Sequence, residues 1–158
     1  MKRRLAIGVG VVALVGAGVG FWLMSPTTGP TRDLTLSPDP KRGEYLIRLG
    51  GCVACHTDTS DDGAFLAGGV SIRSAFGSFI APNITPDPAT GIGDWTLEEF
   101  SRAMSDGVGK EGEHLYPAFP YEFYGQMSDQ DIVDLYAALM AVEPVENQAG
   151  SHELGFPF

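Results

Sequence analysis

The sequence is short of cysteine, histidine and basic side chains, and these shortages exclude several classes of protein. Its 158 residues include 2 cysteines, 3 histidines, and 10 lysines and arginines against 20 aspartates and glutamates, for a net charge of −10. An acidic surface repels phosphate groups, so we do not expect nucleic acid as a partner. A structural zinc site needs four ligands at suitable spacing, and beyond the cysteine pair only isolated histidines remain. Long uninterrupted secondary structure is also scarce, because 21 glycines and 11 prolines punctuate the chain.

Both cysteines fall in one short motif, Cys52-Val53-Ala54-Cys55-His56. A C-x-x-C-H motif is typical of covalent haem attachment. The two thiols add to the two vinyl groups of the haem as thioethers, and the histidine after the second cysteine becomes an axial ligand of the iron. The motif therefore predicts one haem c, bound covalently through Cys52 and Cys55 and ligated by His56.

A C-x-x-C pair also occurs in redox dithiols of the thioredoxin type, in small disulfides and in halves of zinc sites. A thioredoxin-like motif should follow a buried strand in a β-α-β arrangement. Here residues 45–49, with the sequence Tyr-Leu-Ile-Arg-Leu, lead into the motif with helical character. We therefore favour haem over the three alternatives.

Residues 5–24 form an uncharged run that follows three basic residues, Lys2, Arg3 and Arg4. As a helix, at about 1.5 Å per residue, such a run matches a hydrocarbon core of roughly 30 Å. We predict a transmembrane helix that is retained as an anchor, with its basic side in the cytoplasm; a cleaved signal peptide is the alternative. In both cases the remainder of the chain lies on the periplasmic side of the bacterial inner membrane.

Four parts are predicted along the chain. A membrane anchor or signal-anchor occupies residues 1–24, and a tether rich in proline, threonine and glycine occupies residues 25–37. The haem domain covers residues 38–145, and a C-terminal tail without clear periodicity covers residues 146–158.

Three main helices are predicted in the haem domain, which makes its fold all-α. The first follows the N-cap Asp39 and ends at Gly50, so that it presents the cysteines. The second opens on a capping box at residues 96–99 and stops at Gly107. The third opens at Ser128 and carries an apolar stripe.

Residues 57–94 contain scattered glycine, proline and aspartate with isolated apolar side chains. An unsupported loop of this length is unusual in a compact domain, so we interpret it as a loop that wraps the haem. Asn83, Thr85 and Trp95 offer hydrogen-bond donors for the haem propionates. Turn chemistry explains Asn83 and Thr85 equally well, and simple core burial explains Trp95.

Four segments in the same order, 50–57, 82–87, 90–95 and 115–121, resemble the haem domains of the cytochrome subunits of membrane-bound alcohol, aldehyde and gluconate dehydrogenases. The resemblance implies the class I cytochrome c fold, with about three main helices and long loops around one covalent haem. It also implies an electron carrier between a periplasmic dehydrogenase and the quinone pool or an oxidase. The family's cysteines and axial histidine correspond to Cys52, Cys55 and His56.

The chain departs from the family pattern at the second axial ligand. Family members usually carry a methionine within the segment 115–121, where this chain has Phe119, and phenylalanine cannot ligate iron. We expect Phe119 to contact the haem and rank an open or water-ligated sixth site first. His114 ranks second as a replacement ligand, and Met104 and Met127 rank third. Such subunits also commonly contain three haem domains, whereas this chain has one motif.

These observations give one leading function and three alternatives. The leading hypothesis is a membrane-tethered cytochrome c with one haem that passes electrons to and from redox partner proteins, without a catalytic acid, base or nucleophile of its own. The missing methionine also allows a haem-based sensor or small-ligand-binding module with an open sixth site. A peroxidase-like enzyme and a structural haem subunit of a larger membrane complex are the remaining alternatives.

Overall fold

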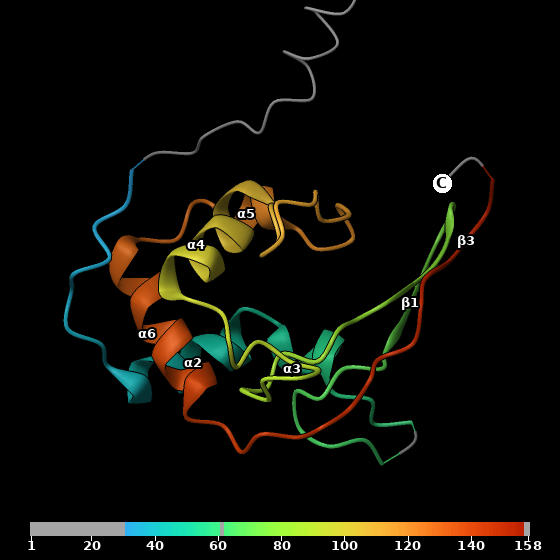
Figure 1. Cartoon of the computed structure of the whole chain (residues 1–158), viewed down its shortest axis with the longest axis horizontal. Helices are drawn as coiled ribbons and strands as arrows, with labels where there is room; N and C mark the ends of the chain where they lie inside the picture. Colours follow the sequence, from blue (N-terminus) through green and yellow to red (C-terminus); the bar gives the residue numbers. More distant parts are fainter. Residues whose placement is uncertain (1–30, 61, 157–158) are drawn as a thin grey trace, which may run out of the picture.

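The computed structural model describes residues 31–60 and 62–156 of the chain. These residues form the helices α2 (Pro40–Leu49), α3 (Cys52–His56), α4 (Leu97–Asp106), α5 (Tyr121–Tyr124) and α6 (Asp129–Met140), and the strands β1 (Ser71–Ser74), β2 (Gly77–Ile80) and β3 (Glu153–Leu154). Figure 1 shows the helices gathered on one side and the strands extending away from them.

The helix boundaries follow from the capping residues. The Asp39 side chain accepts hydrogen bonds from two backbone N–H groups in the first turn of α2. Thr96 and Glu99 form a complete capping box at the start of α4, which ends at Gly107 in a left-handed conformation with φ 64°. Ser128 and Asp131 form a second capping box at the start of α6. The predicted helix starts are therefore confirmed.

Helices α2 and α6 cross closely at Gly43. A Cβ atom at this position would lie 2.0 Å from the Asp134 carbonyl oxygen, so only glycine permits this approach. The buried Asp134 carboxylate accepts hydrogen bonds from the Arg42 guanidinium (2.7 Å) and the Asp39 backbone N–H (2.7 Å). Burial alone raises the pKa of Asp134, but these hydrogen bonds hold that pKa below its ordinary value. The carboxylate is thus a charged tie between the two helices.

The hydrophobic core lies where α2, α4 and α6 meet the loop before α4. Its buried members are Ile47, Leu66, Ile92, Phe100, Met104, Ile132, Leu135, Ala138 and Leu139. Half-buried apolar side chains around the haem motif, among them Cys52, Val53 and Phe119, pack against this core. The core therefore continues directly into the candidate site.

The all-α prediction was wrong, because residues 71–80 form an antiparallel hairpin. Strands β1 and β2 pair from Ser71 with Ile80 to Ser74 with Gly77. Each strand has only four residues and mixes serine and glycine with isolated apolar side chains. So short a run carries too little alternation to distinguish a strand from a loop.

The segment predicted as a tail supplies the third strand. Strand β3 pairs antiparallel with β2, with Gly77 opposite Leu154, and Figure 1 shows the two segments running side by side. The imidazole Nδ1 of His152 accepts a hydrogen bond from the Ile80 backbone N–H at 3.0 Å. The His152 ring also packs edge-on against Phe79 and Tyr116. Residues 152–155 thus pack on the hairpin.

The predicted transmembrane helix is not part of the fold described here. Within residues 31–60 and 62–156, no helix is long and apolar enough to cross a membrane. The apolar run at residues 5–24 lies outside the described residues.

Candidate haem site

The haem motif forms one helical turn, α3, directly after α2. Gly51 separates the two helices with φ 77° and ψ 10°, a left-handed conformation that strongly favours glycine. The turn places Cys52 and Cys55 three residues apart on one helical face, and both are free thiols. The local sequence therefore presents two unpaired thiols together, as attachment to two vinyl groups requires.

Cys52 is held against the protein, whereas Cys55 is exposed. Burial raises the pKa of the Cys52 thiol to about 11. Tyr124 of α5 lies beside it and donates a hydrogen bond from its hydroxyl to the Gly50 carbonyl at 2.6 Å. This hydrogen bond therefore attaches α5 to the short connection between α2 and the haem motif.

His56 has the hydrogen bonding of a metal-ligating histidine. Its Nδ1 lies 2.8 Å from the Pro82 carbonyl oxygen. A carbonyl only accepts hydrogen bonds, so Nδ1 carries the proton and Nε2 is left as the donor nitrogen for a metal. Burial lowers the pKa of His56, against the opposing effect of the Pro82 carbonyl, which favours the neutral imidazole that ligation needs.

The carbonyl of Pro82 is positioned by close packing on Gly68. The Gly68 backbone adopts φ 80°, and a Cβ atom there would lie 2.5 Å from the Pro82 carbonyl carbon. The Gly68 N–H also donates to the His56 carbonyl at 2.8 Å. Gly68 therefore lets the long loop approach the haem motif closely enough for Pro82 to reach the imidazole.

The next residue, Asn83, is buried in a protein hydrogen-bond network. Its amide nitrogen donates to Thr90 Oγ1 (3.0 Å) and to the Val145 carbonyl (2.7 Å). Its amide oxygen accepts from the Thr85 backbone N–H (2.9 Å) and hydroxyl (2.8 Å). These contacts give Asn83 a structural role next to Pro82, and its contact with a propionate stays a prediction.

The structure places the other three predicted residues in two kinds of surroundings. Trp95 is half-buried against the core, and its backbone carbonyl accepts a hydrogen bond from the Tyr136 hydroxyl at 2.8 Å. Phe119 is half-buried with its ring centroid 5.3 Å from that of Tyr124. His114 is exposed, in a short antiparallel bridge with Val108. Trp95 and Phe119 thus belong to the apolar surroundings of the core, whereas His114 lies at the surface.

The residues present fit a haem. Two free thiols share one helical turn, and the neighbouring imidazole has its Nδ1 occupied by a backbone carbonyl. Half-buried apolar side chains pack against the core that the motif adjoins, namely Val53, Ile84, Trp95, Leu97, Phe119, Tyr124 and Met127. A flat apolar macrocycle would complete the burial of such side chains.

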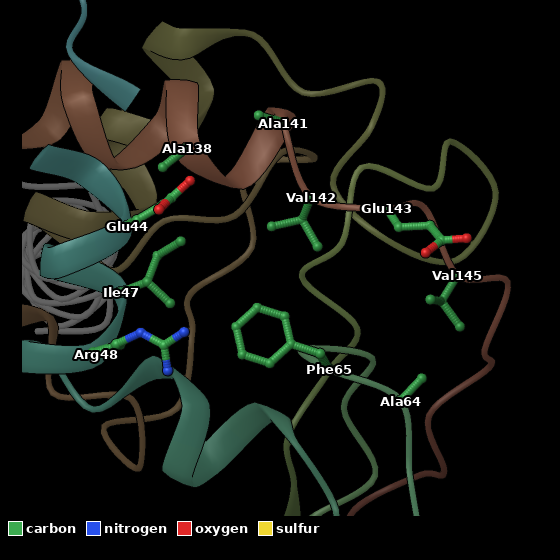
Figure 2. A pocket seen from close by; sticks show the side chains of 10 residues that line it. All are labelled: Glu44, Ile47, Arg48, Ala64, Phe65, Ala138, Ala141, Val142, Glu143 and Val145. Atoms are coloured by element: carbon green, nitrogen blue, oxygen red, sulfur yellow. The ribbon is translucent and has the colours of Figure 1, made fainter. Parts of the chain in front are cut away.

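A separate pocket is lined by residues outside the haem motif. It has a volume of about 490 Å³. Figure 2 shows the side chains that line it, which come from α2, the end of α6 and the loop that carries Phe65. Its lining includes Glu44, Arg48 and Glu143 but none of the three motif residues. It is therefore not part of the candidate haem site.

Three contributors to the site were not predicted from the sequence. Pro82 acts through its carbonyl, Gly68 through its lack of a side chain, and Tyr124 through a hydroxyl that binds α2. Pro82 and Gly68 are visible in the sequence as a proline and a glycine within the long loop. Nothing in the sequence indicates that either residue contacts His56, because they lie 26 and 12 positions away from it.

A helical domain built around a C-x-x-C-H turn, with its histidine bonded to a loop carbonyl, defines a c-type cytochrome. The chain belongs to the cytochrome c family, because the family model for cytochrome c matches residues 40–142.

Its relatives include cytochrome subunits of several dehydrogenases. The chain is 38% identical over 162 residues to a diheme cytochrome c-type protein of Cereibacter sphaeroides, with 100% of the chain and 54% of the relative covered. It is 42% identical over 149 residues to the fructose dehydrogenase cytochrome subunit of Gluconobacter japonicus, covering 94% of the chain and 30% of that subunit. It is 45% identical over 118 residues to the cytochrome c subunit of alcohol dehydrogenase (quinone) of Gluconobacter oxydans, covering 74% and 24%. The chain thus spans about half the length of the first relative and less than a third of the others.

Proposed function

We propose that this chain is an electron carrier with one covalent haem c, attached through Cys52 and Cys55 and ligated by His56 Nε2. The observation that carries the proposal is the hydrogen bond between His56 Nδ1 and the Pro82 carbonyl at 2.8 Å. It sets the imidazole tautomer, so the residue after the second cysteine is already prepared for iron. The haem would supply reversible one-electron chemistry, while the protein positions it and controls its surroundings.

The proposed electron donor is a dehydrogenase. The relatives with dehydrogenase names are subunits of fructose, nicotinate, alcohol and gluconate dehydrogenases. An electron carrier needs no acid, base or nucleophile of its own, and we propose none. The net charge of −10 favours transient docking on a basic surface of the partner.

We propose that the haem domain works on the periplasmic side of the bacterial inner membrane, in contact with membrane-bound redox partners. Attachment of haem c outside the cytoplasm supports this location. Protease treatment of intact spheroplasts tests it, with an antibody against the C-terminal segment as the probe. Degradation without lysis supports the periplasmic side, and protection until lysis contradicts it.

A second candidate function is the binding of a small ligand at the iron. It is favoured by the half-buried Phe119, which packs on Tyr124 and offers no ligand atom. In this case a ferrous iron with an open or water-ligated sixth site binds carbon monoxide readily. A low-spin iron that is insensitive to carbon monoxide excludes this candidate and leaves simple electron transfer.

The haem assignment is tested by expression with a haem c maturation system. We expect the intact mass to rise by one haem and the absorption spectrum of the alkaline pyridine adduct to be that of haem c. Cys52→Ser and Cys55→Ser should each lose one thioether, and the double variant should carry no covalent haem. Ser60→Ala, which changes an exposed residue near the motif, is the control. Absence of covalent haem in the unmodified chain contradicts the proposal.

A further inference from the structure

Arg32 lies before the first described helix and before residue 40, where the match to the cytochrome c family begins. Its side chain is nevertheless only 8% exposed. Its Nε donates to Ser105 Oγ (2.8 Å), and its Nη2 donates to the Gly125 carbonyl (2.8 Å). Its Nη1 donates to the Met127 carbonyl (2.8 Å) and to Asp129 Oδ1 (3.0 Å).

These four acceptors come from three different elements. Ser105 belongs to the last turn of α4, Gly125 and Met127 to the turn after α5, and Asp129 to the first residue of α6. A planar guanidinium with five N–H donors can bind several acceptors at once, which an ammonium group cannot do in the same geometry. Arg32 therefore ties the ends of three helices together.

Asp129, the acidic partner of Arg32, accepts a second hydrogen bond from the residue that follows the arginine. Besides the guanidinium bond, the backbone N–H of Asp33 donates to Asp129 Oδ2 at 2.8 Å. Both carboxylate oxygens of Asp129 are thus bound by consecutive residues of the same segment. A buried charge is tolerated when it is paired and hydrogen-bonded in this way.

The elements that Arg32 ties include a wall of the candidate haem site. Tyr124 of α5 donates to the carbonyl of Gly50, which lies two residues before Cys52, and its ring packs on Phe119. Helix α5 has only four residues, so its own hydrogen bonds contribute little stability. Its position must come from its attachments, and the turn that follows it is held by Arg32.

We propose that Arg32 is a positioning residue for the haem site: it holds α5, and with it Tyr124 and Phe119, closed against the haem and so restricts access of small ligands to the iron. The inference rests on the proposed haem at Cys52 and Cys55. It predicts that loss of the Arg32 contacts opens this wall while leaving the haem attached.

The test compares Arg32→Met with Arg42→Met in the holoprotein. Arg42 also binds two carboxylates, those of Asp131 and Asp134, but it joins α2 to α6 rather than α5 to its neighbours. Arg32→Lys is the second variant, because it retains the charge but not the four-way hydrogen bonding. The readouts are covalent haem by mass, the melting temperature, and the rate at which ferrous protein binds carbon monoxide.

We expect all four proteins to carry haem and both methionine variants to melt at lower temperature. Carbon monoxide should bind about tenfold faster to Arg32→Met than to the unmodified protein. This rate corresponds to a tenfold rise in the fraction of molecules in which α5 has moved away from the haem. Arg32→Lys should show an intermediate rate, and Arg42→Met should bind at the unmodified rate. Equal rates in Arg32→Met and the unmodified protein, or an equal acceleration in Arg42→Met, overturn the inference. Lack of haem in the unmodified protein contradicts the proposed function instead.

Discussion

The buried amide of Asn83 joins the loop that supports His56 to the chain beyond α6. Asn83 is only 2% exposed, and its side chain forms hydrogen bonds with Thr85, Thr90 and Val145. Replacement by alanine removes these four hydrogen bonds and supplies no polar group in their place. We predict that Asn83→Ala destabilises the holoprotein strongly.

The magnitude follows from the groups left behind. The Thr85 backbone N–H loses its acceptor inside the protein, which costs about 1–3 kcal/mol. The Val145 carbonyl and Thr90 Oγ1 each lose one donor but keep other partners, at about 1 kcal/mol each. The total is about 3–5 kcal/mol of unfolding free energy, equivalent to a fall in melting temperature of about 10 °C.

Denaturation by urea, followed by far-ultraviolet circular dichroism on protein with haem confirmed by mass, measures this change. Gln148→Ala is the matched control, because Gln148 is an exposed amide, and its effect should stay within about 0.5 kcal/mol. A loss below about 1 kcal/mol for Asn83→Ala refutes the structural role derived from its contacts. A stable variant with a shifted reduction potential indicates instead that Asn83 binds a propionate.

Three further changes test other parts of the account. Gly68→Ala should cost more than about 3 kcal/mol and shift the haem absorption bands, because the new Cβ displaces the Pro82 carbonyl; calorimetry and spectroscopy measure both effects. Asp134→Asn should destabilise the protein most above about pH 4, and this difference should shrink progressively as the pH falls further, because the pKa of Asp134 is lowered in the folded state and its carboxylate stays charged below pH 4. Melting curves across pH 3–7 measure the difference. Phe119→Met should raise the reduction potential in a redox titration if the position faces the iron, since a thioether ligand favours ferrous haem.

Each of these has a control or a contradicting result. Gly112 also has a positive φ of 86° but no atom within 4 Å of its Cβ position, so Gly112→Ala should cost only about 1 kcal/mol. Equal losses for the two glycines contradict the role of Gly68. A pH-independent difference for Asp134→Asn contradicts a charged carboxylate in the folded state. An unchanged potential and spectrum in Phe119→Met show that residue 119 does not face the iron.

Much of the helical framework could be predicted from short-range signals. Asp39, Thr96 and Ser128 each mark a helix start because capping depends on residues two or three positions apart. The haem motif was equally visible, since its spacing is set by the cofactor and lies within one helical turn. The family named from the residues was confirmed by the comparisons.

The remaining features depend on contacts between distant parts of the chain. The pairing of Gly77 with Leu154 forms the sheet edge, and neither strand has enough residues to show periodicity. Arg32 is a further case. In sequence it belongs to the predicted tether at residues 25–37, but its side chain binds residues more than 70 positions away. The hydrogen bond from His56 to Pro82 depends in the same way on loop geometry that spacing does not reveal.

The central claim, that the haem on this chain carries electrons, is tested most directly by rapid-mixing absorption spectroscopy. The oxidised holoprotein, in membranes or in a purified complex with its dehydrogenase, is mixed with alcohol, gluconate or fructose in turn. The account predicts that with the correct substrate the ferrous haem bands appear at least as fast as the enzyme turns over. A haem that stays oxidised while the dehydrogenase consumes its substrate contradicts it.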